Sequence, residues 1–207
     1  MVKIFLETQS DRTPEYWFFK TLLGKLNISS DAYDIITVGG KDKLFNTTNV
    51  NLMSVNTLEG GRNVVIFDAD SKNNCGGYCI RSEEILTERS KMGLEFELFL
   101  MPNNKEDGDF ETMIEVIARK DLHKAFFDCF GGYEKCIAGH VGIDGNPRYE
   151  IPNLKAKLYA YITSMRMSNT KRNKAKSGNW LFGISDYWDI DSPVLEPLKS
   201  FLISCFS

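Results

Sequence analysis

The sequence predicts an α/β protein in which a parallel sheet is flanked by helices and followed by a helical C-terminal extension. Strand-like and helix-like segments alternate over the first hundred residues, which is typical of a parallel sheet with helices on both faces. Residues 63–67 form the clearest buried strand, because after Asn63 β-branched and aromatic side chains follow one another without alternation. From residue 108 onward the hydrophobic periodicity is mainly helical. We expect an α/β core over residues 1–105 and a mainly helical part over residues 106–207, packed on that core.

The elements of the core follow from local preferences. Residues 2–6 are rich in β-formers, and Thr13 followed by Pro14 is a favourable start for the next helix. The second strand stops at two glycines, the third at acidic residues and the fourth at Pro102. Expected strands cover residues 2–6, 33–38, 63–67 and 96–101; expected helices cover residues 14–26, 41–58 and 82–92, with a polar loop over residues 71–78.

The C-terminal part shows helix signals at both of its ends. Asp109 can cap a helix over residues 110–117, and Pro193 after Ser192 is a good start for the last helix. Further helices are expected over residues 122–130, 133–141, 154–165 and 195–206.

Composition narrows the class of protein. Of the 207 residues, 43% are hydrophobic, which is enough for a core and excludes a wholly disordered chain. The net charge of −3 excludes a strongly basic nucleic-acid coat, although a local basic face is compatible with it. No apolar run approaches the ~20 residues that span a bilayer, and the N-terminus lacks a signal segment. We expect a cytoplasmic protein that is not bound to a membrane.

Acidic residues follow two of the expected strands. Glu7 ends the first strand, Asp68 and Asp70 end the third, and Asp11 lies four residues after Glu7. Functional groups gather at the carboxyl ends of parallel strands, so these carboxylates converge if the two strands are neighbours. Close carboxylates repel one another, and hard divalent ions prefer oxygen ligands. The pattern therefore predicts a site for Mg²⁺ or Mn²⁺.

This order of motifs resembles the TOPRIM domain, which is shared by topoisomerases, bacterial primases and OLD-family nucleases. The stretch from Leu6 to Asp11 is similar to the first OLD-like motif, and the stretch from Phe67 to Asp70 matches the second. The resemblance covers roughly residues 2–105. TOPRIM sequences usually carry glycine after the first glutamate, whereas this chain has Thr8.

The whole chain also resembles a stand-alone TOPRIM-like family. Its members have a strand ending in a Pro-Asp/Asn-Asn turn, then Gly-x-Leu-Glu opening a helix, and later a Lys-Ala-Lys/Arg run. The corresponding stretches here are residues 101–104, 108–111 and 155–157.

The resemblance implies metal-assisted phosphoryl transfer and assigns roles to individual residues. Asp68 and Asp70 would bind Mg²⁺ directly, and Glu7 with Asp11 would act as a second metal ligand or as general base. Two further residues are candidates by the same resemblance: Glu111 as an additional metal ligand and Lys155 as the cation that neutralises the phosphate.

A basic segment stands apart in this slightly acidic chain. Residues 151–185 contain seven basic residues and no acid. The segment could track a phosphate backbone, or it could be a solvated helix face with a flexible loop over residues 169–178. The candidate nucleic-acid-binding residues are Lys157, Arg166, Lys171, Arg172, Lys174 and Lys176.

These observations favour Mg²⁺-dependent hydrolysis of nucleic-acid phosphodiesters, with DNA as the expected substrate. The resemblance also implies an ATPase partner and a role in defence against phage or mobile DNA; because the chain has no Gly-x₄-Gly-Lys-Ser/Thr motif, that ATPase would be a separate polypeptide. Two alternatives stay open. One is a non-catalytic module that binds a metal or a partner on the same scaffold. The other is a phosphatase similar to haloacid dehalogenases, with Asp68 as the nucleophile.

Overall fold

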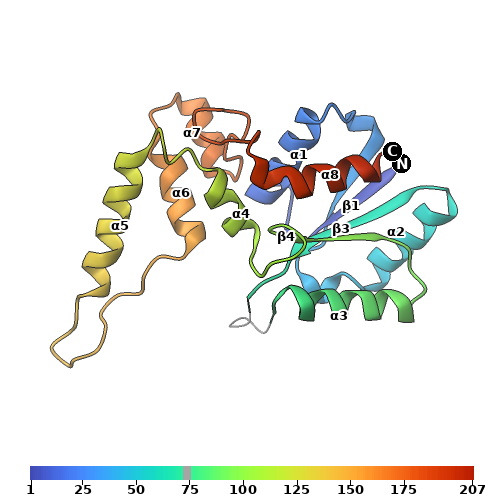
Figure 1. Cartoon of the computed structure of the whole chain (residues 1–207), viewed down its shortest axis with the longest axis horizontal. Coiled ribbons are helices and arrows are strands. Elements are labelled where there is room, and N and C mark those ends of the chain that lie inside the picture. The colour runs from blue at the N-terminus through green and yellow to red at the C-terminus, as the bar shows by residue number, and fades with distance from the viewer. Residues whose placement is uncertain (72–75) are drawn as a thin grey trace.

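The computed structural model describes residues 1–71 and 76–207, so part of the expected loop over residues 71–78 lies outside the described residues (Figure 1). In the described part, four parallel strands form one sheet in the order β2-β1-β3-β4. The strands are β1 (Val2–Leu6), β2 (Tyr33–Thr37), β3 (Arg62–Asp68) and β4 (Glu97–Met101). The expectation of an α/β protein with a parallel sheet is confirmed.

The register of the two central strands aligns their carboxyl ends. Val2 of β1 pairs with Arg62 of β3, and Leu6 pairs with Ile66. The backbone N–H of Glu7 donates to the carbonyl of Ile66 at 3.3 Å, which extends the pairing by one residue. The residues that follow β1 and β3 therefore lie at the same edge of the sheet.

Helices cover both faces of the sheet. Strand side chains alternate between two hydrophobic clusters: Ile4 and Val64 belong to one, and Phe5 and Val65 to the other. In Figure 1, α1 (Pro14–Lys25) and α8 (Glu196–Cys205) lie on one side of the sheet and α2 (Thr47–Leu58) and α3 (Tyr78–Lys91) on the other.

The remaining helices extend the first of these layers. They are α4 (Phe110–Ile117), α5 (Lys124–Ala138), α6 (Leu154–Ser164) and α7 (Asn169–Lys176), and short 3₁₀ helices cover Ser30–Ala32, Lys41–Lys43 and Pro193–Leu195. Buried residues of α4 and α6 belong to the same hydrophobic cluster as Ile4 and Val64. Trp180 and Trp188 stack at 6.3 Å in that cluster, so both are core residues.

Several element boundaries differ from the expectation. One continuous helix, α5, replaces the two helices expected over residues 122–141. Residues 169–176, for which a flexible loop was one of the alternatives, form helix α7, which Ser168 caps by accepting the N–H of Lys171; that alternative is wrong. Helix α2 begins only after Asn46, whose side chain accepts the N–H of Asn49. Helix α3 begins at Tyr78, four residues earlier than expected.

The two ends of the chain meet at the amino edge of the sheet (Figure 1). Arg62 links them, because its backbone N–H donates to the carbonyl of Met1 and its guanidinium donates to the carbonyls of Ser204 and Cys205. In the described part of the chain, no helix is long and apolar enough to cross a lipid bilayer.

Candidate functional site

Two acidic side chains meet at the carboxyl edge of the central strands. The Oε2 atom of Glu7 accepts the backbone N–H of Asp68 at 3.1 Å. The Oδ1 atom of Asp68 accepts the N–H of Phe110 at 2.8 Å, so the last residue of β3 also holds the first residue of α4. Both carboxylates line a small cavity of about 40 Å³. Glu15, from the first turn of α1, lines the same cavity.

Burial and mutual repulsion disfavour the charged forms of this pair. Burial raises the pKa of Asp68 well above its ordinary value, and the charges of Glu7, Glu111 and Asp109 raise it further. Burial also raises the pKa of Glu7; Asp70 adds to the effect, while the Asp68 N–H opposes it. A cation placed between these groups would favour their charged forms.

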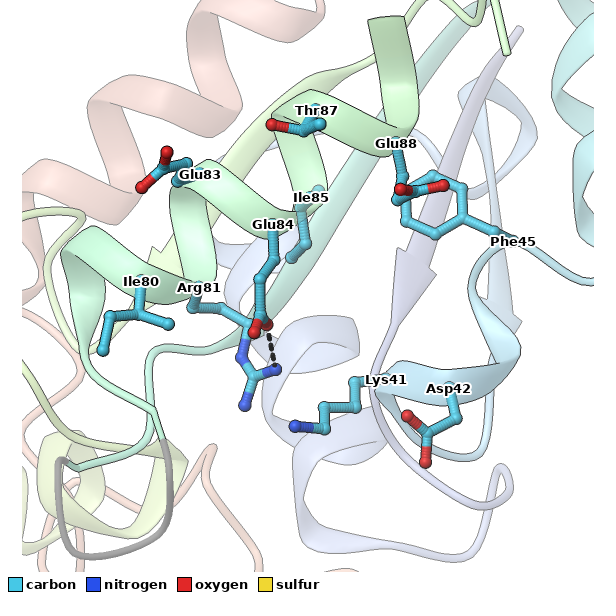
Figure 2. Close-up of a pocket in the computed structure, with 10 residues that line it drawn as sticks. All are labelled: Lys41, Asp42, Phe45, Ile80, Arg81, Glu83, Glu84, Ile85, Thr87 and Glu88. Atoms are coloured by element: carbon cyan, nitrogen blue, oxygen red, sulfur yellow. Dashed lines mark hydrogen bonds and ion pairs between the residues drawn. The ribbon is translucent and has the colours of Figure 1, made fainter. Parts of the chain in front are cut away.

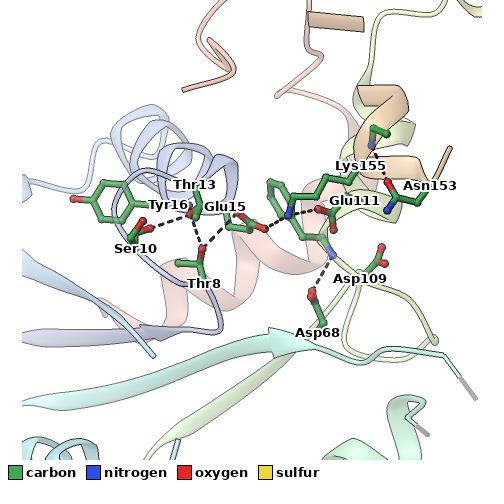
Figure 3. Close-up of polar contacts among 12 residues, drawn as sticks. Thr8, Ser10, Thr13, Glu15, Tyr16, Asp68, Asp109, Glu111, Asn153 and Lys155 are labelled. Carbon is green, nitrogen blue, oxygen red and sulfur yellow. Dashed lines mark hydrogen bonds and ion pairs between the residues drawn. The ribbon is translucent and has the colours of Figure 1, made fainter. Parts of the chain in front are cut away.

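We call Glu7, Glu15 and Asp68, which line the cavity, the acidic group; Lys155 lies at its outer side. Its Nζ atom lies 3.3 Å from Oε1 of Glu15 and 2.9 Å from Oε1 of Glu111 (Figure 3). Burial alone would lower the pKa of Lys155, but these two carboxylates reverse the effect and raise it. Lys155, on α6, therefore connects the C-terminal helices to the edge of the sheet.

Thr8, which follows Glu7 directly, has a structural role in this network. Its side chain is buried, and its hydroxyl shares a hydrogen bond with Thr13 and donates to Oε2 of Glu15 at 3.5 Å (Figure 3). Hydrogen bonds and ion pairs thus run without interruption from Thr13 through Glu15 to Lys155. Thr8 helps to hold Glu15 against the cavity.

Asp70 is paired with an arginine rather than placed in the cavity that Glu7 and Asp68 line. It has φ = 60° and pairs with Arg81 of α3, whose Nη2 lies 2.5 Å from its Oδ2. Arg81 also pairs with Glu84 at 3.0 Å. Asp11 is exposed in the turn before α1, and in the described ranges no hydrogen bond or ion pair joins its side chain to the other acids.

The predicted nucleic-acid-binding residues divide into two groups. Lys157 pairs with Glu115 at 2.9 Å, and Arg172 donates to the carbonyls of Thr163 and Met165 at the end of α6. These two side chains have partners within the fold. The others are exposed on and around α7: Arg166, Lys171, Lys174 and Lys176.

The acidic group fits a hard divalent cation by the chemistry of its donors. Glu7, Glu15 and Asp68 supply only carboxylate oxygens to one cavity, and two of them have raised pKa values. Over residues 1–71 and 76–207, no three acidic, cysteine or histidine side chains are already placed to hold a metal ion. Binding would therefore require the carboxylates to turn toward the ion, exchanging the N–H partners that they hold now.

Two members of the site were not predicted from the sequence. Glu15 was missed because an acid in the first turn of a helix is usually explained by the helix dipole, although its position eight residues after Glu7 was a usable signal. Arg81 was missed because nothing in a polar helix sequence distinguishes its one buried cation.

The fold and this site define a class: a parallel α/β protein with partly buried carboxylates at the carboxyl edge of its two central strands. The chain belongs to the family described as "Protein of unknown function (DUF3226)", whose model matches residues 2–207. Comparison with curated proteins and comparison with solved structures each found no match.

Proposed function

We propose that the protein is a TOPRIM-like hydrolase that cleaves nucleic-acid phosphodiesters with the help of Mg²⁺ or Mn²⁺. The observation that supports the proposal is that Glu7 and Asp68 line one cavity and are joined by a hydrogen bond from the Asp68 N–H to Glu7. Burial and the charge of Glu7 disfavour the ionised form of Asp68, and a bound cation would favour it. Glu7 and Asp68 would hold the ion, with Glu15 as the third oxygen donor. Asp70 would join them only by leaving Arg81.

The residues around the cavity suggest how the reaction would be supported. A bound divalent ion supplies Lewis acidity and makes a water molecule easier to deprotonate. Lys155, held between Glu15 and Glu111, would offer its positive charge to a phosphate at the outer side of the acids. Glu111, whose pKa is raised mainly by burial, would be available to accept a proton. We further propose a cytoplasmic site of action, DNA as substrate and a separate ATPase as partner, with defence against phage or mobile DNA as the setting.

Metal binding is the first test. The free energy of unfolding of the wild-type protein should rise when Mg²⁺ or Mn²⁺ replaces EDTA, since a ligand of the folded state stabilises it by mass action. Asp68→Asn should abolish this rise, whereas the matched variant Asp11→Asn, in the exposed turn, should retain it. A rise of equal size in wild-type protein and in Asp68→Asn would contradict the assigned site.

Cleavage is the second test. Plasmid DNA, single-stranded DNA and single-stranded RNA are incubated with each protein, with and without Mn²⁺. The proposal expects metal-dependent nicking by wild type and by Asp11→Asn, and none by Asp68→Asn.

A non-catalytic module is the second candidate, and one observation favours it. Three of the predicted acids already have partners: Glu7 and Asp68 accept backbone N–H groups, and Asp70 accepts from Arg81. Metal-dependent stabilisation without cleavage of any of the three substrates would select this alternative. Phosphatase chemistry at Asp68 is less favoured, because burial raises its pKa and a nucleophilic carboxylate must be ionised.

A further inference from the structure

A second cavity lies on the C-terminal side of the acidic group, and we call it the basic pocket. It is an open depression with a volume of about 660 Å³. Its wall combines the turn before α1, the start of α6 and the end of α7. The residues that matter here are Arg12, Lys155, Tyr159, Lys176 and Gly178.

The lining of the basic pocket is one-sided in charge. Arg12, Lys155 and Lys176 contribute three cations, and no acid lines the pocket. Among the described residues, neither Arg12 nor Lys176 has a carboxylate within ion-pair distance. In a chain with net charge −3, this concentration of unpaired positive charge favours an anionic ligand.

An aromatic side chain adds a second property. Tyr159 is 42% exposed and lines the pocket together with apolar atoms of Pro14 and Ala156. Trp180 also contributes to the wall but is only 2% exposed, so its ring is committed to the core. A ring beside unpaired cations is the combination that binds a base together with its phosphate, because every base offers a flat face for stacking.

The pocket wall is fixed by a close backbone approach. Gly178 has φ = 92°, and a Cβ atom at this position would lie 2.0 Å from the carbonyl oxygen of Arg12. The end of α7 is therefore seated directly on the turn that carries Arg12, which fixes the backbone positions from which Arg12 and Lys176 extend. Such preorganisation lowers the entropy cost of binding.

A neighbouring cavity is also lined by cations and an aromatic side chain. It has a volume of about 380 Å³ and is lined by Lys20, Lys171 and Lys174 with Trp17, again with no acid. Helix α7 contributes to both cavities. The two cavities offer a path for more than one phosphate of a strand.

We infer that the basic pocket binds one nucleotide of a single-stranded nucleic acid, with the base on Tyr159 and the phosphate between Arg12 and Lys176. This rests on the proposed function and adds to it, because Lys155 lines the pocket and also contacts Glu15 and Glu111. A nucleotide held here places the strand beside the acidic group.

The inference is tested by fluorescence anisotropy in EDTA, so that no cleavage or metal binding enters the measurement. The probes are a labelled oligothymidylate and an abasic oligonucleotide of the same length and charge. Tyr159→Ala should weaken binding of the oligothymidylate about fivefold or more, the effect of losing one stacked base, and leave abasic binding unchanged. Tyr159→Phe should restore stacking, and the control Tyr133→Ala on α5, which is also exposed, should bind as wild type.

Two further experiments distinguish the contribution of charge from that of stacking, and binding of a strand from binding of a free nucleotide. Lys176→Gln should weaken binding of both probes and reduce the slope of log affinity against log salt concentration by about one, whereas Lys135→Gln on α5 should change neither. Thymidine monophosphate should displace the oligothymidylate only weakly, since it makes fewer contacts.

Three results would overturn the inference: no binding of either probe by the wild-type protein, equal effects of Tyr159→Ala on both probes, or displacement by the monophosphate at concentrations as low as those of the oligonucleotide. None of these bears on metal binding at Asp68. The inference and the proposed function can therefore fail separately.

Discussion

Arg81 holds Asp70 by a 2.5 Å contact, although Asp70 lies only two residues after the end of the strand that delivers Asp68 to the cavity. The arginine side chain is 2% exposed and its Nε has no hydrogen-bond partner among the described residues, so its charge depends on Asp70 and Glu84. One Asp-x-Asp motif thus serves two purposes. Its first acid joins Glu7 (Figure 3 shows its bond to α4), and its second neutralises a buried cation. Figure 2 shows Arg81 and Lys41 directed toward the same pocket from opposite sides.

Removing the Asp70 charge should destabilise the protein more than removing that of Glu84. Asp70→Asn leaves a buried guanidinium with one partly exposed partner, and we expect a loss of about 2–3 kcal/mol in the free energy of unfolding. Glu84 is 54% exposed, so Glu84→Gln should cost less than about 1 kcal/mol. Urea denaturation measures both; equal losses would refute the assignment of Asp70 as the principal counter-ion.

Replacing Asp68 should stabilise the protein in the absence of divalent ions. Because its pKa is raised in the folded state, the unfolded chain ionises first as pH rises above the ordinary value of 3.8, and the folded state loses stability over that interval. Asp68→Asn keeps an oxygen for the Phe110 N–H but removes this loss. The variant should therefore gain stability relative to wild type in EDTA as pH rises above the ordinary value of 3.8. A difference that does not change with pH would contradict this account.

Gly178 should tolerate no side chain. Gly178→Ala combines a positive φ with a clash against the Arg12 carbonyl, and a cost of about 2–4 kcal/mol is expected. Gly131→Ala, within α5 and with open space around its Cβ position, should instead gain about 0.5–1 kcal/mol. Thermal unfolding of both variants tests the pair, and an unchanged Gly178→Ala midpoint would exclude the close approach.

Cys205 should resist alkylation. Burial and the hydrogen bond of its thiol to Glu97 raise the pKa of Cys205 to about 12, from an ordinary value of 9.0. At pH 8.5 its thiolate fraction is several hundred times lower than that of an ordinary thiol, whereas Cys129 and Cys136 are exposed. Peptide-level mass spectrometry after iodoacetamide treatment should find Cys129 and Cys136 modified and Cys205 intact. Unfolding in urea should remove the protection, and fast modification of Cys205 in the folded protein would count against its burial.

The sequence was sufficient to predict the strands of the sheet, because each strand has a strong local pattern. Residues 64–67 are apolar on both faces, and each strand ends at glycine, proline or acid, so all four strands were placed within one or two residues. Helix α7 was missed because its polar residues show no hydrophobic period; Ser168, the buried Ala175 and the bonds from Arg172 to the carbonyls of Thr163 and Met165 secure it.

The sequence predicted at which edge of the sheet the candidate site lies, but not how its side chains are arranged there. Strand order brings Glu7 and Asp68 together, and the strand ends in the sequence indicate this. The direction of a side chain after a strand depends on contacts distant in sequence. Arg81 pairs with Asp70, and Lys155 on α6 pairs with both Glu15 and Glu111. No local pattern encodes these choices.

The meeting of both chain ends at Arg62 has a practical meaning for experiments. A fluorophore, a purification tag or a surface tether attached at either end would sit at the edge of the sheet opposite to Glu7 and Asp68. Immobilised protein would then present its carboxylates and α7 to the bulk solution, whichever end is chosen for attachment.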